Sequence, residues 1–325
     1  MDFNIKVVLI SFVVTVGLAI CILPILRRLK VGQIERDDGP QSHLRKQGTP
    51  TMGGIIIAVS IILVTFFMVW YYSNKEAEVA FKLLPLLFVT IGFGIIGFVD
   101  DFKKLVLKNT KGLKPAYKML GLLIIAVAYT LYLTNVLKIG TDTYLPFFKT
   151  YFTIPYWLYI PFAIFVLLAT TNAINLTDGI DGLSTSVTTI IITTLTVIGI
   201  IYEIQEVAIF GSIMVGALLG FLLFNLHPAK VFMGDTGSLL IGGIIAGLAL
   251  YLKMPLLLLL IALIPILETL SVMIQVLYFK KTGNRIFKMA PLHHHFELCG
   301  WNENKIVSVF TIITLGLCII GMMSI

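Results

Sequence analysis

Five aspartates stand where long apolar segments of this chain end, and they are the residues best suited to chemistry. Asp100 and Asp101 are adjacent, Asp178 and Asp181 are three residues apart, and Asp235 lies in a Gly-Asp-Thr-Gly-Ser run. Carboxylates gathered on one side of a membrane form a site for a cation. This hypothesis requires that the three loops share one side.

The Asp100-Asp101 pair follows an apolar run at the carboxyl end of an expected helix. The helix dipole already places partial negative charge there, so two further anions need a positive partner. Lys103 and Lys104 would meet that need as a solvated surface cluster. The functional alternative is a divalent metal or a general base.

Asn172, Asn175, Asp178 and Asp181 recur every three residues. On a helix this spacing places amide and carboxylate oxygens near one face, where they would contact substrate or metal. The alternative is that Asp178-Gly179 and Asp181-Gly182 form turns and caps before the next span. Four polar residues exceed what a cap needs, which favours the contact role.

Asp235 or Ser238 would serve as the cap of the helix that follows, which is the simplest interpretation. However, Gly234 and Gly237 allow the backbone to approach a ligand, and a helix N-terminus favours phosphate. Oxygen ligands without converging cysteines point to Mg²⁺, which binds one or two carboxylates together with water and phosphate. The pattern therefore indicates phosphoryl chemistry.

Three consecutive histidines, 293–295, follow the basic segment 280–288. Consecutive residues point in different directions on a helix, so a zinc site made of all three is disfavoured. At least one is expected to donate a hydrogen bond to phosphate. Glu268 is the one acid well inside an expected span, which makes it a functional candidate unless neighbouring helices satisfy it.

The elements that position these residues are expected to be membrane helices. The chain is 58% hydrophobic and 13% charged, against roughly 45–50% and about 25% in soluble domains. Ten apolar runs approach the ~20 residues that cross a bilayer. They lie near 4–26, 53–72, 83–99, 117–134, 156–174, 184–202, 207–225, 237–252, 254–279 and 306–324. We expect an all-α polytopic membrane protein with one domain, 1–325.

Of the 24 Lys and Arg, 18 fall in five loops, three of which carry the aspartates: 27–52, 100–118, 171–183, 226–236 and 280–305. By the positive-inside rule these loops face the cytoplasm and both termini face outward. The net charge of +7 would attract anionic lipid headgroups or a phosphorylated substrate, and nucleic acid is not expected as a partner. The three cysteines show no disulfide or zinc spacing.

Two segments are less regular. The expected ninth span would reach ~39 Å as one helix and contains Pro265, so it should tilt or kink. A kinked helix splayed from the bundle would open a groove to lipid, whereas a tilted helix would not. The loop 135–155 is predicted to form a short hairpin or an interfacial aromatic layer.

Several motifs together resemble the polyprenyl-phosphate N-acetylhexosamine-1-phosphate transferases. They are the segments 46–54 and 172–182, the Asp100-Asp101 pair, Gly234 to Ser238, and Ala-Pro-Leu-His-His-His-Phe-Glu at 290–297. The resemblance runs through the whole chain, and the triple histidine followed by Phe-Glu favours the muramoyl-pentapeptide branch.

The resemblance implies transfer of phospho-N-acetylmuramoyl-pentapeptide from its UDP carrier to undecaprenyl phosphate, with release of UMP. It also implies Mg²⁺ dependence, a homodimer, and a multi-pass position in the cytoplasmic membrane of a bacterium with the site facing the cytoplasm. Four positions resemble catalytic residues: Asp100, Asp101, Asp235 and His294. Asp235 resembles the metal ligand. Ten positions resemble substrate contacts: Lys46, Thr51, Asn172, Asn175, Asp178, Asp181, Phe232, Gly234, Gln275 and His295.

Two mechanisms stay open at this point. Asp100 deprotonates the lipid phosphate for direct in-line attack, or a carboxylate first takes the sugar phosphate covalently. Direct attack is favoured because a phosphate is already nucleophilic near neutral pH. The alternatives in function are a secondary transporter or flippase, which would show related halves and charges near the midplane, and a transferase acting on UDP-N-acetylglucosamine.

Overall fold

The computed structural model describes residues 2–28, 48–105, 107 and 112–325. Lys46, predicted to contact substrate, lies outside the described residues. In chain order the elements are α1 (Asp2–Arg28), α3 (Gly54–Ser73), α4 (Ala77–Leu105), α5 (Pro115–Leu131), the π-helical turn η1 (Tyr132–Val136), β1 (Asp142–Leu145), β2 (Thr150–Thr153), α6 (Tyr156–Thr177), α7 (Leu183–Ile201), α8 (Gln205–Asn225), α9 (Gly234–Tyr251), the 3-10 turn η2 (Pro255–Leu257), α10 (Leu258–Ile261), α11 (Leu263–Thr282), α12 (Leu292–Leu298) and α13 (Glu303–Met323).

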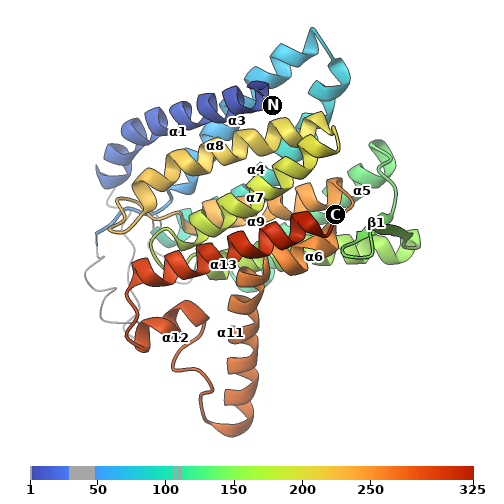
Figure 1. Cartoon of the computed structure of the whole chain (residues 1–325). Helices are drawn as coiled ribbons and strands as arrows, with labels where there is room; N and C mark the ends of the chain where they lie inside the picture. Colours follow the sequence, from blue (N-terminus) through green and yellow to red (C-terminus); the bar gives the residue numbers. More distant parts are fainter. Residues whose placement is uncertain (1, 29–47, 106, 108–111) are drawn as a thin grey trace.

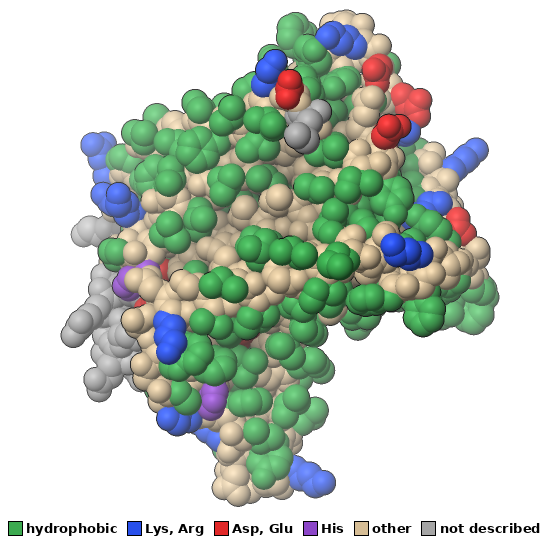
Figure 2. Space-filling view, viewed as in Figure 1, with side chains coloured by type: hydrophobic (Ala, Val, Ile, Leu, Met, Phe, Trp, Pro, Cys, Tyr) green, Lys and Arg blue, Asp and Glu red, His purple; other side chains and the backbone are tan. Residues whose placement is uncertain are grey.

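Ten helices in the described part of the chain are long and apolar enough to cross a bilayer. This confirms the predicted all-α architecture with ten spans. Most of the long helices run side by side, with both termini and β1 at one end of the bundle (Figure 1). Hydrophobic side chains cover much of the lateral face in view, while charged side chains gather toward its ends (Figure 2).

The centre of the bundle is α9, which is buried along nearly its whole length. Its small residues allow close approach of neighbouring helices, which is how helices associate where no water drives them together. Gly242 lies against the backbone of Thr171 in α6, and Gly243 lies against the Phe93 ring in α4. The tight packing of α4 and α6 on α9 fixes the ends of these helices relative to one another.

The predicted ninth span is broken rather than continuous. It consists of η2, α10 and α11, with the interruption at Ala262. Pro265 explains this position, because its ring conflicts with the carbonyl four residues earlier, at Ile261, and it donates no hydrogen bond there. Beyond the break α11 leaves the bundle steeply (Figure 1), so the predicted departure from a straight helix is confirmed.

The loop 135–155 contains the predicted hairpin. β1 and β2 are antiparallel, with Asp142 opposite Thr153 and Leu145 opposite Thr150. Thr153 donates a hydrogen bond to Asp142 at 2.7 Å, and the Lys253 ammonium lies 3.3 Å from the same carboxylate. These contacts attach the hairpin to the turn that follows α9, at the end of the bundle opposite the start of α9.

Candidate active site

Asp101 holds the amino terminus of α9. Its carboxylate accepts hydrogen bonds from the backbone N–H of Asp235 at 3.2 Å and of Thr236 at 2.8 Å, and from the Thr236 hydroxyl at 2.6 Å. A carboxylate at a helix N-terminus satisfies unpaired N–H groups and complements the helix dipole. The cap considered for Asp235 or Ser238 as the simplest interpretation is therefore supplied instead by Asp101 on α4.

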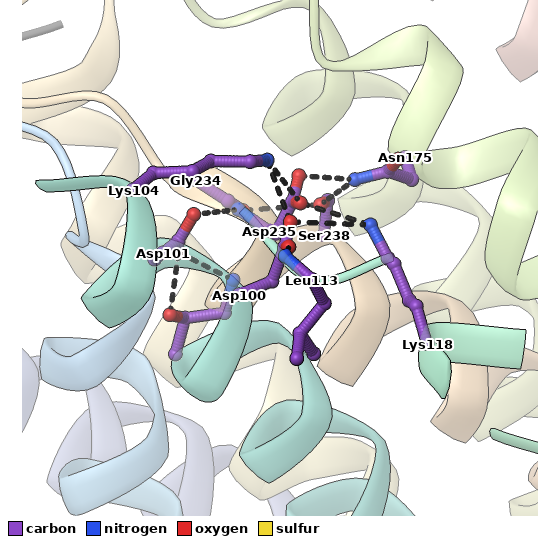
Figure 3. Close-up of polar contacts among 10 residues, drawn as sticks. Asp100, Asp101, Lys104, Leu113, Lys118, Asn175, Gly234, Asp235 and Ser238 are labelled. Atoms are coloured by element: carbon purple, nitrogen blue, oxygen red, sulfur yellow. Dashed lines mark hydrogen bonds and ion pairs between the residues drawn. The ribbon is translucent and has the colours of Figure 1, made fainter. Parts of the chain in front are cut away.

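Asp100 and Asp235 share two lysine partners. The Lys104 ammonium lies 2.6 Å from Asp100 and 3.0 Å from Asp235, and that of Lys118 lies 3.7 and 2.9 Å from the same carboxylates. The lysines reach Asp235 from opposite sides (Figure 3). Asp100 also accepts a hydrogen bond from the Leu113 N–H at 2.7 Å. Lys104 therefore bridges two carboxylates of the cluster, which goes beyond the solvated surface cluster considered as the alternative.

Close backbone contact keeps these aspartates together. A side chain at Gly97 of α4 would meet the Asp235 carbonyl, and one at Gly54 of α3 would meet the backbone of Gly237. The three helices can meet at the start of α9 only because these positions are glycines.

A short backbone ladder places the segment before α3 beside the start of α9. Phe232 N–H donates to the Pro50 carbonyl, and the N–H groups of Gly53 and Gly54 donate to the carbonyls of Phe232 and Met233, each at 2.8 Å. Thr51 consequently lies next to Gly234, whose φ of +73° suits glycine. The predicted substrate contacts Thr51, Phe232 and Gly234 thus meet beside Asp235.

The polar run at 172–181 divides between two places. Asn175 donates hydrogen bonds at 2.8 Å to both Asp235 and the Ser238 hydroxyl, whereas Asn172 donates to the Leu168 carbonyl of its own helix. Because α6 ends at Thr177, the four residues do not share one helical face, and the turns considered as the alternative are present.

Asp178 follows the end of α6 and faces the aspartate cluster. Burial, followed by the negative charges of Asp235 and Asp101, raises the pKa of its carboxyl from 3.8 to about 8. Asp178 therefore keeps its proton near neutral pH, and in that form it can donate a hydrogen bond as well as accept one.

Asp181 belongs to a second group. Its carboxylate lies 2.9 Å from His227 Nδ1 and accepts a hydrogen bond from the Ala229 N–H at 3.1 Å, and its own N–H donates to Glu303. Ligand atoms of Asp181, His227 and Glu303 lie within 4.8 Å of one another. Since this group mixes a histidine nitrogen with carboxylates, its donors match Mg²⁺ less well than an all-oxygen set.

The histidine segment forms α12 and the turn before it. His294 Nδ1 lies 2.7 Å from Glu297, and His295 Nδ1 accepts a hydrogen bond from the Lys288 N–H. Gln275 accepts hydrogen bonds from the N–H groups of Ile286 and Phe287. His295 and Gln275 therefore hold the turn in place, and no contact in the described residues joins them to the aspartate cluster.

The donors around Asp235 fit a magnesium ion. Oxygens of Asp100 and Asp235 converge on the same two ammonium groups, so they point toward a common space that attracts cations. The Asp235 side chain is 18% exposed, whereas Asp100 is 3% exposed. Asp235 is therefore the carboxylate that an entering ion would meet first.

The sequence model of glycosyl transferase family 4 matches residues 83–253, and the phospho-N-acetylmuramoyl-pentapeptide-transferase signature 1 matches residues 46–57. Proteins named phospho-N-acetylmuramoyl-pentapeptide-transferase from three bacteria are similar over nearly their full length. The Acetivibrio thermocellus protein is 46% identical over 99% of this chain and 96% of its own. The Clostridium botulinum protein is 49% identical over 96% and 94%, and the Bacillus cytotoxicus protein 47% identical over 96% and 94%. The chain therefore belongs to glycosyl transferase family 4 and, within it, to the phospho-N-acetylmuramoyl-pentapeptide transferases.

Proposed function

We propose that this chain transfers phospho-N-acetylmuramoyl-pentapeptide from its UDP carrier to undecaprenyl phosphate, forming lipid I and releasing UMP for peptidoglycan synthesis. The observation that carries the proposal is the meeting of Asp100 and Asp235 with two lysines at the start of α9. Such a group can bring two phosphates together. The names of the relatives supply the identity of the sugar phosphate.

Magnesium is the cofactor that this donor set supports. Asp235, the more exposed of the two carboxylates, would hold it, and the bound ion would neutralise phosphate charge and leave positions for phosphate oxygens and water. Asn175 orients the Asp235 carboxylate through its hydrogen bond at 2.8 Å. Asp101 contributes by fixing the α9 N-terminus, which makes it a positioning residue.

The two lysines would reduce the repulsion between the negative charges of the reacting phosphates. Both reactants are anions that repel each other, and Lys104 and Lys118 already lie within 3.0 Å of Asp235. Preorganised cations of this kind stabilise the charge that is shared among oxygens during phosphoryl transfer. We assign them to the phosphates of the nucleotide substrate.

Direct in-line attack is the mechanism that we favour. An oxygen of the lipid phosphate bonds to the phosphorus attached to the sugar, and the bond from that phosphorus to UMP breaks. The Lys104 ammonium lies 2.6 Å from Asp100 and would hold this carboxylate where it can accept a proton from the lipid phosphate. That phosphate already carries one negative charge near neutral pH, so only its remaining proton has to be removed.

Asp100→Asn tests the role of the base. We expect the variant to lose most UMP release near neutral pH and to recover at high pH, where the lipid phosphate ionises without help. A trapped aspartyl-phosphosugar would contradict direct attack and would establish the covalent route instead.

The lipid acceptor would reach the site along α11. This helix leaves the bundle (Figure 1) and exposes large apolar side chains such as Leu267, Leu270 and Ile274, which suits contact with a polyprenyl chain or membrane lipid. The basic loops at the aspartate end support a cytoplasmic orientation in the bacterial cell membrane. We further propose a homodimer built from one transmembrane domain per chain.

A nucleotide-exchange assay tests the substrate. Purified protein with undecaprenyl phosphate and Mg²⁺ is given either UDP-N-acetylmuramoyl-pentapeptide or UDP-N-acetylglucosamine, and UMP release is measured. The proposal predicts release from the muramoyl nucleotide. Release from the N-acetylglucosamine nucleotide alone would assign the chain to the related activity, and transport of lipid without UMP release would overturn the transferase.

A further inference from the structure

Glu268 is a fully buried acid in α11, with 0% of its surface exposed. Among the described residues its carboxylate has two hydrogen-bonding contacts, and both are with His293. The backbone N–H of His293 donates to Oε1 at 3.2 Å, and Nδ1 of the ring lies 3.1 Å from Oε2. Burying a carboxyl group away from water costs free energy unless hydrogen bonds compensate for the lost hydration. For Glu268 the described residues supply that compensation through His293.

His293 is equally buried, with 1% exposed. Its second ring nitrogen, Nε2, is inaccessible to water and has no hydrogen-bond partner in the described residues. Buried polar atoms are almost always paired in folded proteins. An unpaired nitrogen beside a proposed phosphoryl-transfer site is therefore a candidate for contact with substrate.

The direction of the ring supports that interpretation. Nε2 occupies the space that a β-carbon at Gly179 would need. Gly179 follows Asp178, whose carboxyl senses the charges of Asp235 and Asp101. The ring therefore connects the carboxylate of α11 with the turn that borders the aspartate cluster.

We propose that Glu268 is a positioning residue that fixes His293 with its proton on Nδ1, so that Nε2 is the nitrogen that exchanges a hydrogen bond or a proton with the substrate. The nitrogen that binds a carboxylate must carry the proton, and the other is then free to act. The proposal rests on the proposed function, because the substrate that Nε2 meets is the one assigned to this site.

Nitrogen NMR reads the proton position without any turnover. The chain holds five histidines, so a ¹⁵N-histidine spectrum of the full chain in detergent is simple, and His293→Asn identifies the signals of His293. In the wild type we expect the signals of one neutral tautomer, with the proton on Nδ1, as the contact with Glu268 predicts. Glu268→Gln should mix the two tautomers of the neutral ring.

Gly179→Ala gives the same test without changing Glu268. The added methyl group would displace the ring, so the tautomer should again become mixed. Glu78→Gln is the matched control, because Glu78 is exposed, pairs with Lys82 and lies at the first turn of α4, far from the aspartates. A His293 spectrum that Glu268→Gln leaves unchanged would overturn the proposal.

Activity measurements on Glu268 variants distinguish a role in positioning His293 from a role in stabilising the fold alone. Glu268→Gln should lower kcat for UMP release about 10- to 100-fold, as loss of an orienting partner does, with KM for the nucleotide changed less than about threefold. The acidic side of the pH profile should shift, and Glu268→Asp should recover part of kcat. Glu78→Gln should match the wild type.

Two outcomes distinguish failure of the proposal for Glu268 from failure of the proposed function. If Glu268→Gln and Glu268→Asp lose stability equally and the pH profile of the remaining activity does not move, Glu268 only supports the fold and the proposal is wrong. If the wild type itself releases no UMP, the proposed function fails, while the NMR spectra still decide whether Glu268 sets the proton position of His293.

Discussion

The substitution Asp101→Asn tests whether Asp101 has a structural role, as the cap of α9, and not a role in the reaction itself. Asp101 is 5% exposed and accepts hydrogen bonds from two backbone N–H groups and one hydroxyl of α9. In Asp101→Asn one carboxylate oxygen becomes an NH₂ group, which would face a donor where an acceptor is needed. The start of α9, which carries Asp235, would lose part of its cap.

The expected cost follows from these contacts. A hydrogen bond to a charged acceptor contributes about 1.5–3 kcal/mol, and the negative charge at a helix N-terminus contributes about 0.3–1 kcal/mol. Asp101→Asn should therefore lower the free energy of unfolding by about 2–4 kcal/mol and should also lower UMP release, because Asp235 shifts with its helix.

Asp100→Asn is the matched control in the same turn of α4. Its amide oxygen can still accept the hydrogen bond from Leu113, and both lysines keep Asp235 as a partner, so its loss of stability should be smaller. Unfolding is followed by titration with SDS from mixed micelles. An Asp101→Asn protein as stable as the wild type, or less destabilised than Asp100→Asn, would refute the capping role.

Three further changes test other parts of the account. Lys118→Met should lower kcat/KM for the nucleotide about 10²-fold, because one preorganised cation is lost, while Lys114→Met, at an exposed lysine, should change it little; UMP release under equal Mg²⁺ measures both. In Asp178→Asn the pH dependence tied to this carboxyl should vanish. The wild type keeps its proton in the folded state up to about pH 8, whereas the unfolded chain loses it near pH 4. Between about pH 4 and pH 8 the wild-type free energy of unfolding should therefore fall relative to that of the variant. Unfolding is measured at several pH values in chelator, and an equal pH dependence of the two proteins would contradict this. Gly54→Ala should lower the free energy of unfolding by about 1–3 kcal/mol, because the added methyl group meets the α9 backbone. Gly17→Ala, whose methyl group meets nothing within 4 Å, should be at least as stable as the wild type.

The membrane architecture was predictable from the sequence because long apolar segments identify membrane-spanning helices. All ten spans were predicted, and Pro265 indicated the irregular ninth one, since each signal depends on neighbouring residues. The aspartates were also identified from sequence, because charge is rare where apolar runs end.

The partners of those aspartates were not predictable in the same way. The cap that Asp101 gives to α9 joins residues 134 apart, and Lys118 reaches Asp235 across 117 residues. Neither contact leaves a periodic pattern. For Glu268 the sequence indicated an acid that needed a partner, but only the packing of α12 against α11 shows that the partner is His293.

The dependence of UMP release on Mg²⁺ in Asp235→Asn, compared with the wild type, tests the central claim most directly. If Asp235 is the carboxylate at which the cation and the phosphates meet, the wild type should lose release in chelator and regain it with Mg²⁺, and the variant should stay inactive at every concentration. Release by the wild type in full chelation, or a variant with the same Mg²⁺ response as the wild type, would contradict the account.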